Sequence, residues 1–188
     1  MRHVMPNLHP MIQLLNPKMA FANTNTFKKL ISNRKPTQLE FYLKNGASEN
    51  IMSLVPLSNK AFGEGMQRII SEIFGCEAST NTGHDAVYRG HNIEIKSARY
   101  WSGTGDCKWQ HIMDDHNYTW VLLALVDFQD LKFWLVSKEV IRAHPEVFAQ
   151  QGNAEGQGRW CSMKKALPLA HPVASREDLD RVIFPESV

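Results

Sequence analysis

Two nearly continuous apolar runs constrain the fold of this chain more than any other feature. They are TWVLLALVDF at 119–128 and LKFWLV at 131–136, separated by Gln129 and Asp130. Strands that are covered on both faces read as unbroken hydrophobic runs, whereas half-exposed strands alternate. We therefore predict two central strands with both faces covered. The longest run, VLLALV at 121–126, is too short to cross a bilayer.

A long helix and a β-hairpin are predicted before these strands. Ser58 or Asn59 can cap the helix, and Gly75 ends it. Its apolar residues recur at helical spacing, and they are Phe62, Met66, Ile69, Ile70 and Ile73. The segments DAVY at 85–88 and NIEIKSA at 92–98 then form a hairpin around a short polar turn that contains a glycine.

The remaining elements follow from capping residues and turn signals. Thr26 caps a short helix that stops before Pro36, and the segment 38–46 is either a strand or a helical turn. Ser137 and Ser175 cap the helices SKEVIRAHPEVF and REDLDRVIF. Residues 1–25 are predicted to be irregular, and the glycine-rich segment 151–160 is predicted to be a mobile surface loop.

This order of elements predicts an α/β fold, an α+β mixed sheet flanked by helices in a single domain. We divide the chain into a basic N-terminal extension, partly irregular, at 1–57 and a main domain at 58–188. The three cysteines are odd in number and widely spaced, which favours a reducing, cytoplasmic environment over a disulfide framework. They are Cys76, Cys107 and Cys161.

Positive charge is concentrated near the N-terminal end. Residues 1–60 carry eight Lys and Arg against two Glu, a net charge of +6, while the remainder carries −4. Such a segment can bind a polyanion such as nucleic acid. The alternative is an ordinary solvated face without a partner.

Three charged side chains are predicted to converge on the hairpin. Successive strand residues point to opposite faces, so Glu94 and Lys96 share a face, and the hairpin brings Asp85 beside them. Two nearby carboxylates repel each other unless a cation lies between them, and oxygen ligands favour a hard ion such as Mg²⁺. A metal ion with Lys96 beside its bound water could hydrolyse a phosphodiester. The alternative is an ordinary cross-strand ion pair on a surface hairpin.

These residues resemble the motif of the PD-(D/E)XK nuclease superfamily, in the restriction-endonuclease-like branch that includes type II restriction enzymes. The resemblance covers roughly residues 58–140 and implies a restriction-endonuclease-like core in a nuclease domain at 58–188. It also implies that Asp85 and Glu94 bind Mg²⁺, for which Mn²⁺ substitutes. The carbonyl group of Ile95 adds a ligand, and Lys96 acts on the attacking water.

The chain departs from the family pattern at two positions. Family members tend to carry a Glu on the preceding helix, four residues after a Gly, but that position here is Gln67. Glu64 lies one turn earlier, and both residues stay candidates for the metal shell. His84 stands where the family has a Pro. The segment KWQHI at 108–112 resembles the Gln-bearing helix of many members, which makes Gln110 a candidate catalytic contact to phosphate or water.

The resemblance implies double-stranded DNA as the substrate and a homodimer as the active form, without a membrane or a small-molecule cofactor. Basic and aromatic side chains in polar loops are the candidate DNA contacts. They are Arg99, Tyr100, Trp101, Lys108 and Arg159. Cys107, His111 and His116 lack the paired spacing of a zinc site, so zinc is not expected.

Three functional hypotheses follow. The first is a sequence-specific endonuclease of the restriction type. The second keeps the fold and the chemistry but acts on branched or damaged DNA in repair or recombination, or on single strands. The third is a non-catalytic DNA-binding or assembly module, against which the presence of all three charged residues counts.

Overall fold

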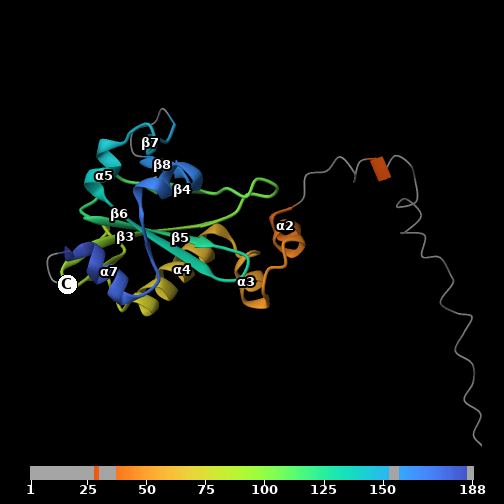
Figure 1. Ribbon diagram of the computed structural model, residues 1–188, viewed down its shortest axis with the longest axis horizontal. Coiled ribbons are helices and arrows are strands. Elements are labelled where there is room, and N and C mark those ends of the chain that lie inside the picture. Colours follow the sequence, from red (N-terminus) through yellow and green to blue (C-terminus); the bar gives the residue numbers. More distant parts are fainter. Residues whose placement is uncertain (1–27, 30–36, 153–156, 186–188) are drawn as a thin grey trace, which may run out of the picture. The chain divides into compact units, whose positions relative to one another are not determined.

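The computed structural model describes residues 28–29, 37–152 and 157–185 (Figure 1). The chain divides into two units, Met1–Lys35 and Pro36–Val188. The second unit therefore begins ahead of the boundary predicted at residue 58.

The predictions for the N-terminal end fall mostly outside this description. Lys28 and Lys29 are helical, and the rest of the helix predicted from Thr26 lies outside the described residues. So do the segment 1–25 and the middle of the predicted loop, residues 153–156. Residues 159 and 160, at the end of that predicted loop, belong to a strand, so the loop prediction was wrong there.

A six-stranded mixed sheet forms the centre of the second unit, which confirms the predicted mixed sheet. Its strands lie in the order β1-β2-β3-β5-β6-β9, with β3 and β5 parallel and the other neighbours antiparallel. A second sheet has the order β4-β8-β7. The strands are β1 (Glu77–Ala78), β2 (Ala86–Tyr88), β3 (His91–Arg99), β4 (Lys108–Ile112), β5 (Trp120–Val126), β6 (Leu131–Ser137), β7 (Ala149–Gln150), β8 (Arg159–Ser162) and β9 (His171–Val173).

The helices flank these sheets and begin largely where capping residues predict. The Ser58, Ser137 and Ser175 side chains each accept a hydrogen bond from the first turn of their helix. The helices are α2 (Gln38–Lys44), α3 (Glu49–Leu54), α4 (Asn59–Phe74), α5 (Lys138–Ala143), α6 (Met163–Ala166) and α7 (Arg176–Ile183). None of the helices in the described part of the chain is long and apolar enough to cross a membrane.

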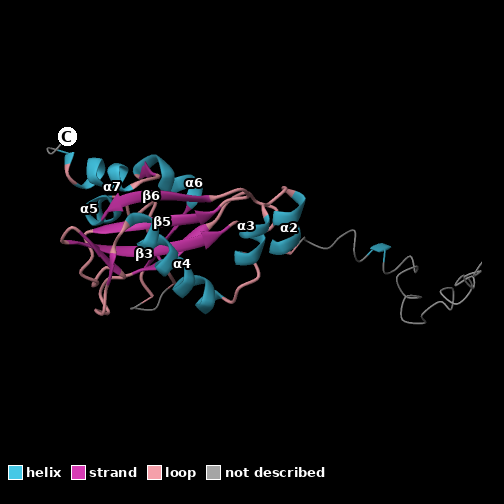
Figure 2. Cartoon of the chain, turned by 90° about the horizontal axis from the view of Figure 1, so that it is seen from below, coloured by secondary structure: helices cyan, strands magenta, loops and turns pink. Residues whose placement is uncertain are grey.

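The two faces of the large sheet are covered by different layers. The ring of Phe133 meets that of Phe74 on α4, with 5.1 Å between centroids, whereas the neighbouring Trp134 meets Trp109 on β4 at 6.2 Å. Because adjacent strand residues point to opposite faces, α4 and β4 lie on opposite sides of the sheet. Figure 1 shows α4 and α7 on one side and the small sheet on the other. Figure 2 shows α4 lying across the sheet near β3.

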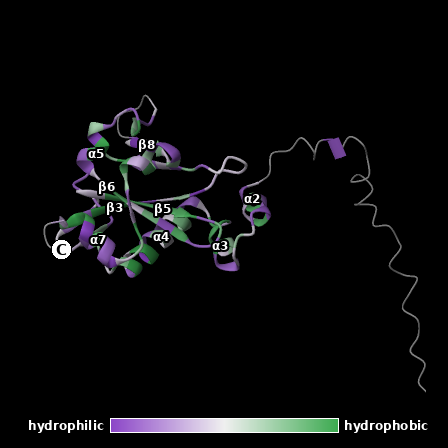
Figure 3. Cartoon of the chain, in the orientation of Figure 1, coloured by the Kyte–Doolittle hydropathy of each residue, from purple (hydrophilic) through white to green (hydrophobic). Residues whose placement is uncertain are grey.

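Strand β5 is the most deeply buried part of the fold. Every residue from Val121 to Val126 is buried, and hydropathy colouring shows this strand as hydrophobic (Figure 3). Strand β6 pairs with β5 along its whole length, with Leu123 opposite Trp134. The prediction of two central strands is confirmed; both faces are covered along β5, whereas β6 is only partly covered and Lys132 is exposed.

Helix α4 packs an apolar stripe against the sheet and ends at a left-handed glycine. Phe62, Met66, Ile70 and Phe74 are buried, whereas Ile73 is 42% exposed, so its place in the predicted stripe was wrong. The helix turns 100° per residue, and Phe74 rather than Ile73 falls in line with Ile70. Gly75 adopts φ 65°, and a Cβ atom there would lie 2.4 Å from the guanidinium of Arg176.

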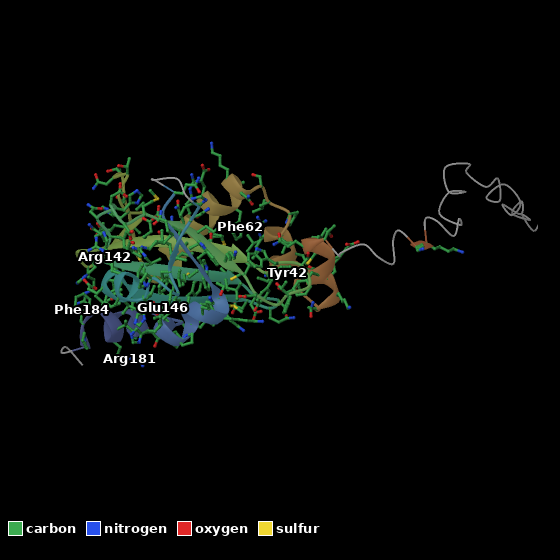
Figure 4. All side chains as sticks on the ribbon, turned by 90° about the horizontal axis from the view of Figure 1, so that it is seen from above. Tyr42, Phe62, Arg142, Glu146, Arg181 and Phe184 are labelled. Carbon is green, nitrogen blue, oxygen red and sulfur yellow. The ribbon has the colours of Figure 1, made fainter. Side chains whose placement is uncertain are left out.

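Helix α2 decides between the two alternatives for residues 38–46 and belongs to the core. Thr37 and Glu40 form a reciprocal capping box that starts the helix. The buried hydroxyl of Tyr42 donates to the carbonyl of Val126 at 2.5 Å and accepts the N–H of Tyr100 at 3.0 Å. Figure 4 shows Tyr42 at the end of the sheet where α2 lies, opposite the end that carries Phe184.

The segment KWQHI forms strand β4, so the helix predicted around Gln110 was wrong. Trp109 is buried and its indole N–H donates to the carbonyl of Ala124 at 2.8 Å. Lys108 and Trp109 pair with Ser162 and Cys161 of β8. A crossover between the parallel strands β3 and β5 must cover one face of the sheet, and a second small sheet does so here in place of a helix.

Candidate active site

The candidate site begins where strands β2 and β3 separate. Their register pairs Ala86 with Ile93, and the Asp85 N–H donates to the Ile93 carbonyl at 3.0 Å. Beyond this point the carboxylate of Asp85, in place of a backbone carbonyl, pairs with β3. Its Oδ2 accepts the main-chain N–H of Ile95 at 2.7 Å. The side chain therefore occupies the opening between the strands, and an otherwise unpaired backbone donor holds it there.

Glu94 and Lys96 project from β3 on the face that carries β4. Glu94 lies level with Val121 and Lys96 with Leu123, and Leu123 lies opposite Trp134, whose ring packs against β4. Glu94 is 2% exposed. Its Oε1 lies 2.6 Å from Lys96 Nζ. The predicted common face of these two residues is confirmed.

The two helix candidates from α4 have different surroundings. Gln67 Nε2 donates to Asp85 Oδ1 at 2.8 Å, so both carboxylate oxygens of Asp85 are held. The side chain of Glu64 is 56% exposed and lies 4.0 Å from the Lys60 ammonium. Of these two residues, Gln67 contacts Asp85 and Glu64 pairs along the exposed face of the helix.

His84, in place of the family's Pro, supports the turn before Asp85. Its ring is buried, with Nε2 3.0 Å from Ser79 Oγ and Nδ1 2.8 Å from Asn117 Oδ1. The side chain thereby links the turn before β2 to the loop before β5. A proline would restrict one backbone angle, whereas this histidine restrains the same turn through two side-chain contacts.

His116 approaches the site, although sequence analysis considered it only for zinc. Its Nδ1 lies 3.7 Å from Glu94 Oε2, is buried, and has no hydrogen-bond partner among the described residues. Its carbonyl accepts a hydrogen bond from Lys138 Nζ. A signal for this residue exists in the sequence. The parallel strands β3 and β5 begin at the same edge, so polar residues just before Trp120 lie near Glu94.

The site contains two carboxylates, Asp85 and Glu94, and one ammonium group, that of Lys96, to balance their charge. Burial raises the pKa of Asp85, and the nearby Glu94 carboxylate raises it further. The hydrogen bond from Ile95 and the Coulomb interaction with Lys96 act in the opposite direction. With both acids ionised, Asp85, Glu94 and Lys96 together carry a net negative charge.

The donors present at this site suit a hard divalent cation. Mg²⁺ is usually held by one or two carboxylates and keeps several waters. The carboxylates of Asp85 and Glu94 therefore match its usual protein ligands in type and number. The carbonyl of Ile95 is a further oxygen donor between them. In the described part of the chain, no group of three or more His, Cys, Asp or Glu side chains is arranged to hold a metal ion. The fit therefore rests on the two carboxylates and the raised pKa of Asp85.

Three of the predicted DNA contacts are engaged within the protein. Arg99 donates to the carbonyls of Val55 and Leu57 at 2.5 and 2.9 Å. The ring of Tyr100 is buried, at 8% exposure, and its hydroxyl donates to Asp127. Arg159 forms an ion pair with Asp114 at 2.8 Å.

The other predicted contacts remain open to solvent at least in part. Trp101 is 41% exposed, and the Lys108 ammonium lies 4.9 Å from the centre of its ring. Gln110 is exposed on β4. These three residues line one groove.

No protein-family model matches the chain, and no curated protein matches it either. The account of its function therefore starts from the site residues themselves.

Proposed function

We propose that the chain is a Mg²⁺-dependent endonuclease that hydrolyses phosphodiester bonds of double-stranded DNA, with Mn²⁺ as a substitute ion. One observation carries this proposal. The carboxylate of Glu94 is buried against Lys96, next to an Asp85 whose pKa is raised, at the opening between two strands. A buried acid beside a second acid is costly without a cation, so an arrangement of this kind suits a function that supplies one.

Each residue has a distinct part in the proposed reaction. Asp85 and Glu94 hold the cation, and the carbonyl of Ile95 adds an oxygen. A bound Mg²⁺ supplies charge stabilisation at the phosphate and lowers the pKa of a coordinated water. Lys96 holds the attacking water through Nζ and neutralises charge on a phosphate oxygen. Gln67 orients Asp85 through their 2.8 Å hydrogen bond.

The cation also explains how an acidic site accepts a polyanion. Asp85 and Glu94 repel a DNA phosphate, and the single charge of Lys96 does not offset both. With a divalent ion held by Asp85 and Glu94, the site would carry a net positive charge and would attract the DNA backbone. The proposed activity therefore depends strictly on a divalent cation.

The order of elements supports a restriction-endonuclease-like core as part of this proposal. A helix packed on the sheet, α4, precedes the antiparallel strands β1, β2 and β3, and β5 then joins parallel to β3. Asp85 lies just before β2 and Glu94 lies on β3. Cleavage of both strands at symmetric positions is achieved most simply by two copies related by a two-fold axis, so we include a homodimer in the proposal.

Digestion of plasmid DNA tests the proposed function. Full-length protein is incubated with plasmid in Mg²⁺ or in EDTA, and the fragment ends are sequenced. We expect discrete fragments with a shared end sequence in Mg²⁺ and intact plasmid in EDTA. Cleavage of flaps or junctions without an end sequence would instead favour the repair or recombination type. Intact DNA under all conditions would overturn the nuclease assignment.

A further inference from the structure

A polar groove lies along the last residues of β3, Ser97 to Arg99, which follow Lys96 in the strand. It has a volume of about 390 Å³ and lies between the first turns of α4 and strand β4. Ser97, the residue that follows Lys96, is part of its lining. The groove also includes Asn59 and Gly63 on α4 and Gln110 and His111 on β4. Figure 4 labels Phe62, which lies in the α4 wall.

An irregularity in β4 presents two neighbouring side chains to this groove. The pairing of β4 with β8 shifts between Trp109 and Ile112, and His111 adopts the left-handed φ of 59°. In a regular strand Gln110 and His111 would point to opposite faces, yet both are exposed and both line the groove. Bulges redirect side chains near functional sites. The positive φ of His111 is a strained backbone conformation, and contacts with the surrounding structure must offset its free energy.

A positive charge is held at the same groove. The Lys108 ammonium lies 3.8 Å from the ring centre of Trp160 and 4.9 Å from that of Trp101. Two aromatic faces restrict a side chain that is otherwise among the most flexible, so less entropy is lost when a phosphate binds. The described ion pairs do not include Lys108, whereas they include Arg159.

We propose that this groove is a base-reading subsite, which holds the DNA strand beside the bond that is cut. Lys108 contacts a phosphate, and Gln110 and His111 form hydrogen bonds with base edges. Phosphate contacts set the register of a DNA strand, whereas side-chain donors and acceptors at base edges supply the sequence preference. This inference rests on the proposed nuclease function, because the neighbouring Lys96 site defines which bond lies beside the groove.

Gly63 allows the groove to be filled without damage to the fold. A Cβ atom at Gly63 would meet nothing within 4 Å outside its own helix backbone, and the same holds for Gly65. Gly63 lines the groove, whereas the described lining does not include Gly65. Replacement of a helical glycine by methionine favours the helix by roughly 1 kcal/mol at either position. Gly63→Met therefore places a side chain in the groove, and Gly65→Met is its matched control.

The test compares both variants with the wild-type full chain. Binding to a fluorescently labelled duplex is measured in EDTA, and cut ends from a randomised duplex library are sequenced in Mg²⁺. We expect Gly63→Met to bind about tenfold more weakly or worse, the discrimination that one good base contact supplies, and to lose its end-sequence preference. Gly65→Met should behave as wild type, and both variants should melt at or above the wild-type temperature.

A second pair of variants separates base reading from simple obstruction. Gln110→Ala and His111→Ala remove the proposed readers without filling the groove. We expect each to relax the preference at one position of the cut-end sequence. Lys108→Met should weaken binding to all sequences alike, because a phosphate contact carries no base information.

The outcomes distinguish the two proposals. If wild type cuts and Gly63→Met binds and cuts with an unchanged end-sequence profile, the groove is not a base-reading subsite, and the nuclease assignment stands. An unchanged profile in both alanine variants would overturn it as well. If wild-type protein cuts no DNA, both proposals fail together.

Discussion

Asp85 is the residue on which the candidate site depends most. Hydrogen bonds fix the position of its carboxylate, and its surroundings disfavour the ionised form. Its two oxygens accept hydrogen bonds from Ile95 and Gln67, and burial together with Glu94 raises its pKa. The raised pKa means that ionisation of this group opposes folding unless a cation compensates. The site is thus built to be completed by positive charge.

Substitution of Gln67 tests this reasoning at the residue scale. Gln67→Glu removes the donor to Asp85 and adds a third acid. In EDTA the free energy of unfolding should fall by about 1–3 kcal/mol, the cost of a lost hydrogen bond to a charged group. Saturating Mg²⁺ should restore much of this loss, because a bound ion stabilises the folded state. Chemical denaturation with and without Mg²⁺ measures both effects.

Gln67→Met is the matched control, since it removes the donor without adding charge. It should lose stability in EDTA and recover no more than wild type on addition of Mg²⁺. Equal responses of the two variants to Mg²⁺ would contradict a cation beside Asp85.

Strand alternation alone predicted that Glu94 and Lys96 share a face, because period-two geometry follows from the backbone. The contact between Asp85 and Gln67 was not predicted, and neither was the approach of His116 to Glu94. Those contacts join residues from different elements, and their geometry depends on how α4 and the loop before β5 pack. Local pattern does not contain that information.

At the scale of elements, the sequence predicted the strands β2, β3, β5 and β6 and the helix caps, but it did not predict the other five strands of the described residues or the form of the crossover. The apolar runs became β5 and β6 because burial on both faces leaves a clear hydrophobic signature. Strand β4 was mistaken for a helix because five residues are too few for periodicity to decide, and the family resemblance favoured a helix. Its pairing with β8, some fifty residues later in the chain, determines its form.

Asp127, just after β5, links Tyr100, which follows β3, to Lys132 on β6. Burial acts to raise its pKa, but hydrogen bonds from Lys132 and from the Tyr100 hydroxyl outweigh burial, and the pKa lies below its ordinary value. The ionised form therefore stabilises the folded state above the unfolded pKa of about 3.9. This contribution is lost as pH falls through the lower folded pKa.

We expect Asp127→Asn to lower the free energy of unfolding by roughly 1–2 kcal/mol at pH 7, with a difference that shrinks toward pH 3. Urea denaturation across this range measures it. Glu72→Gln, which removes the same charge from an exposed position on α4, should show little change at either pH. A difference for Asp127→Asn that is the same at pH 3 and pH 7 would contradict the assigned role.

At the scale of the whole molecule, the boundary at residue 35 separates a unit with a basic sequence, Met1–Lys35, from the unit Pro36–Val188. The unit Pro36–Val188 includes buried Tyr42, Ile51 and Val55, which lie before the predicted boundary. The predicted boundary at residue 58 followed the basic charge of the N-terminal segment and the start of the family resemblance. The buried side chains Tyr42, Ile51 and Val55 place α2 and α3 in the core of the second unit. Composition alone does not reveal which side chains are buried.

Removal of residues 1–35 should leave the melting temperature unchanged but weaken DNA binding. This segment carries six Lys and Arg and no Asp or Glu. Its loss should make the dependence of log binding constant on log salt concentration shallower, because fewer counterions are released from DNA. A chain that starts at residue 58 should instead melt at a lower temperature, since it lacks three buried side chains. An unchanged salt slope would contradict a role for the basic segment in DNA binding.

The rate of duplex DNA hydrolysis by Glu94→Gln, compared with wild type in saturating Mg²⁺, tests whether Glu94 is part of a nuclease site. The substitution keeps the shape of a buried side chain and removes its charge, and its melting temperature establishes that the variant is folded. We expect wild type to cut the duplex and the variant to cut it at least about a hundredfold more slowly. A folded variant that cuts DNA at the wild-type rate would contradict this expectation.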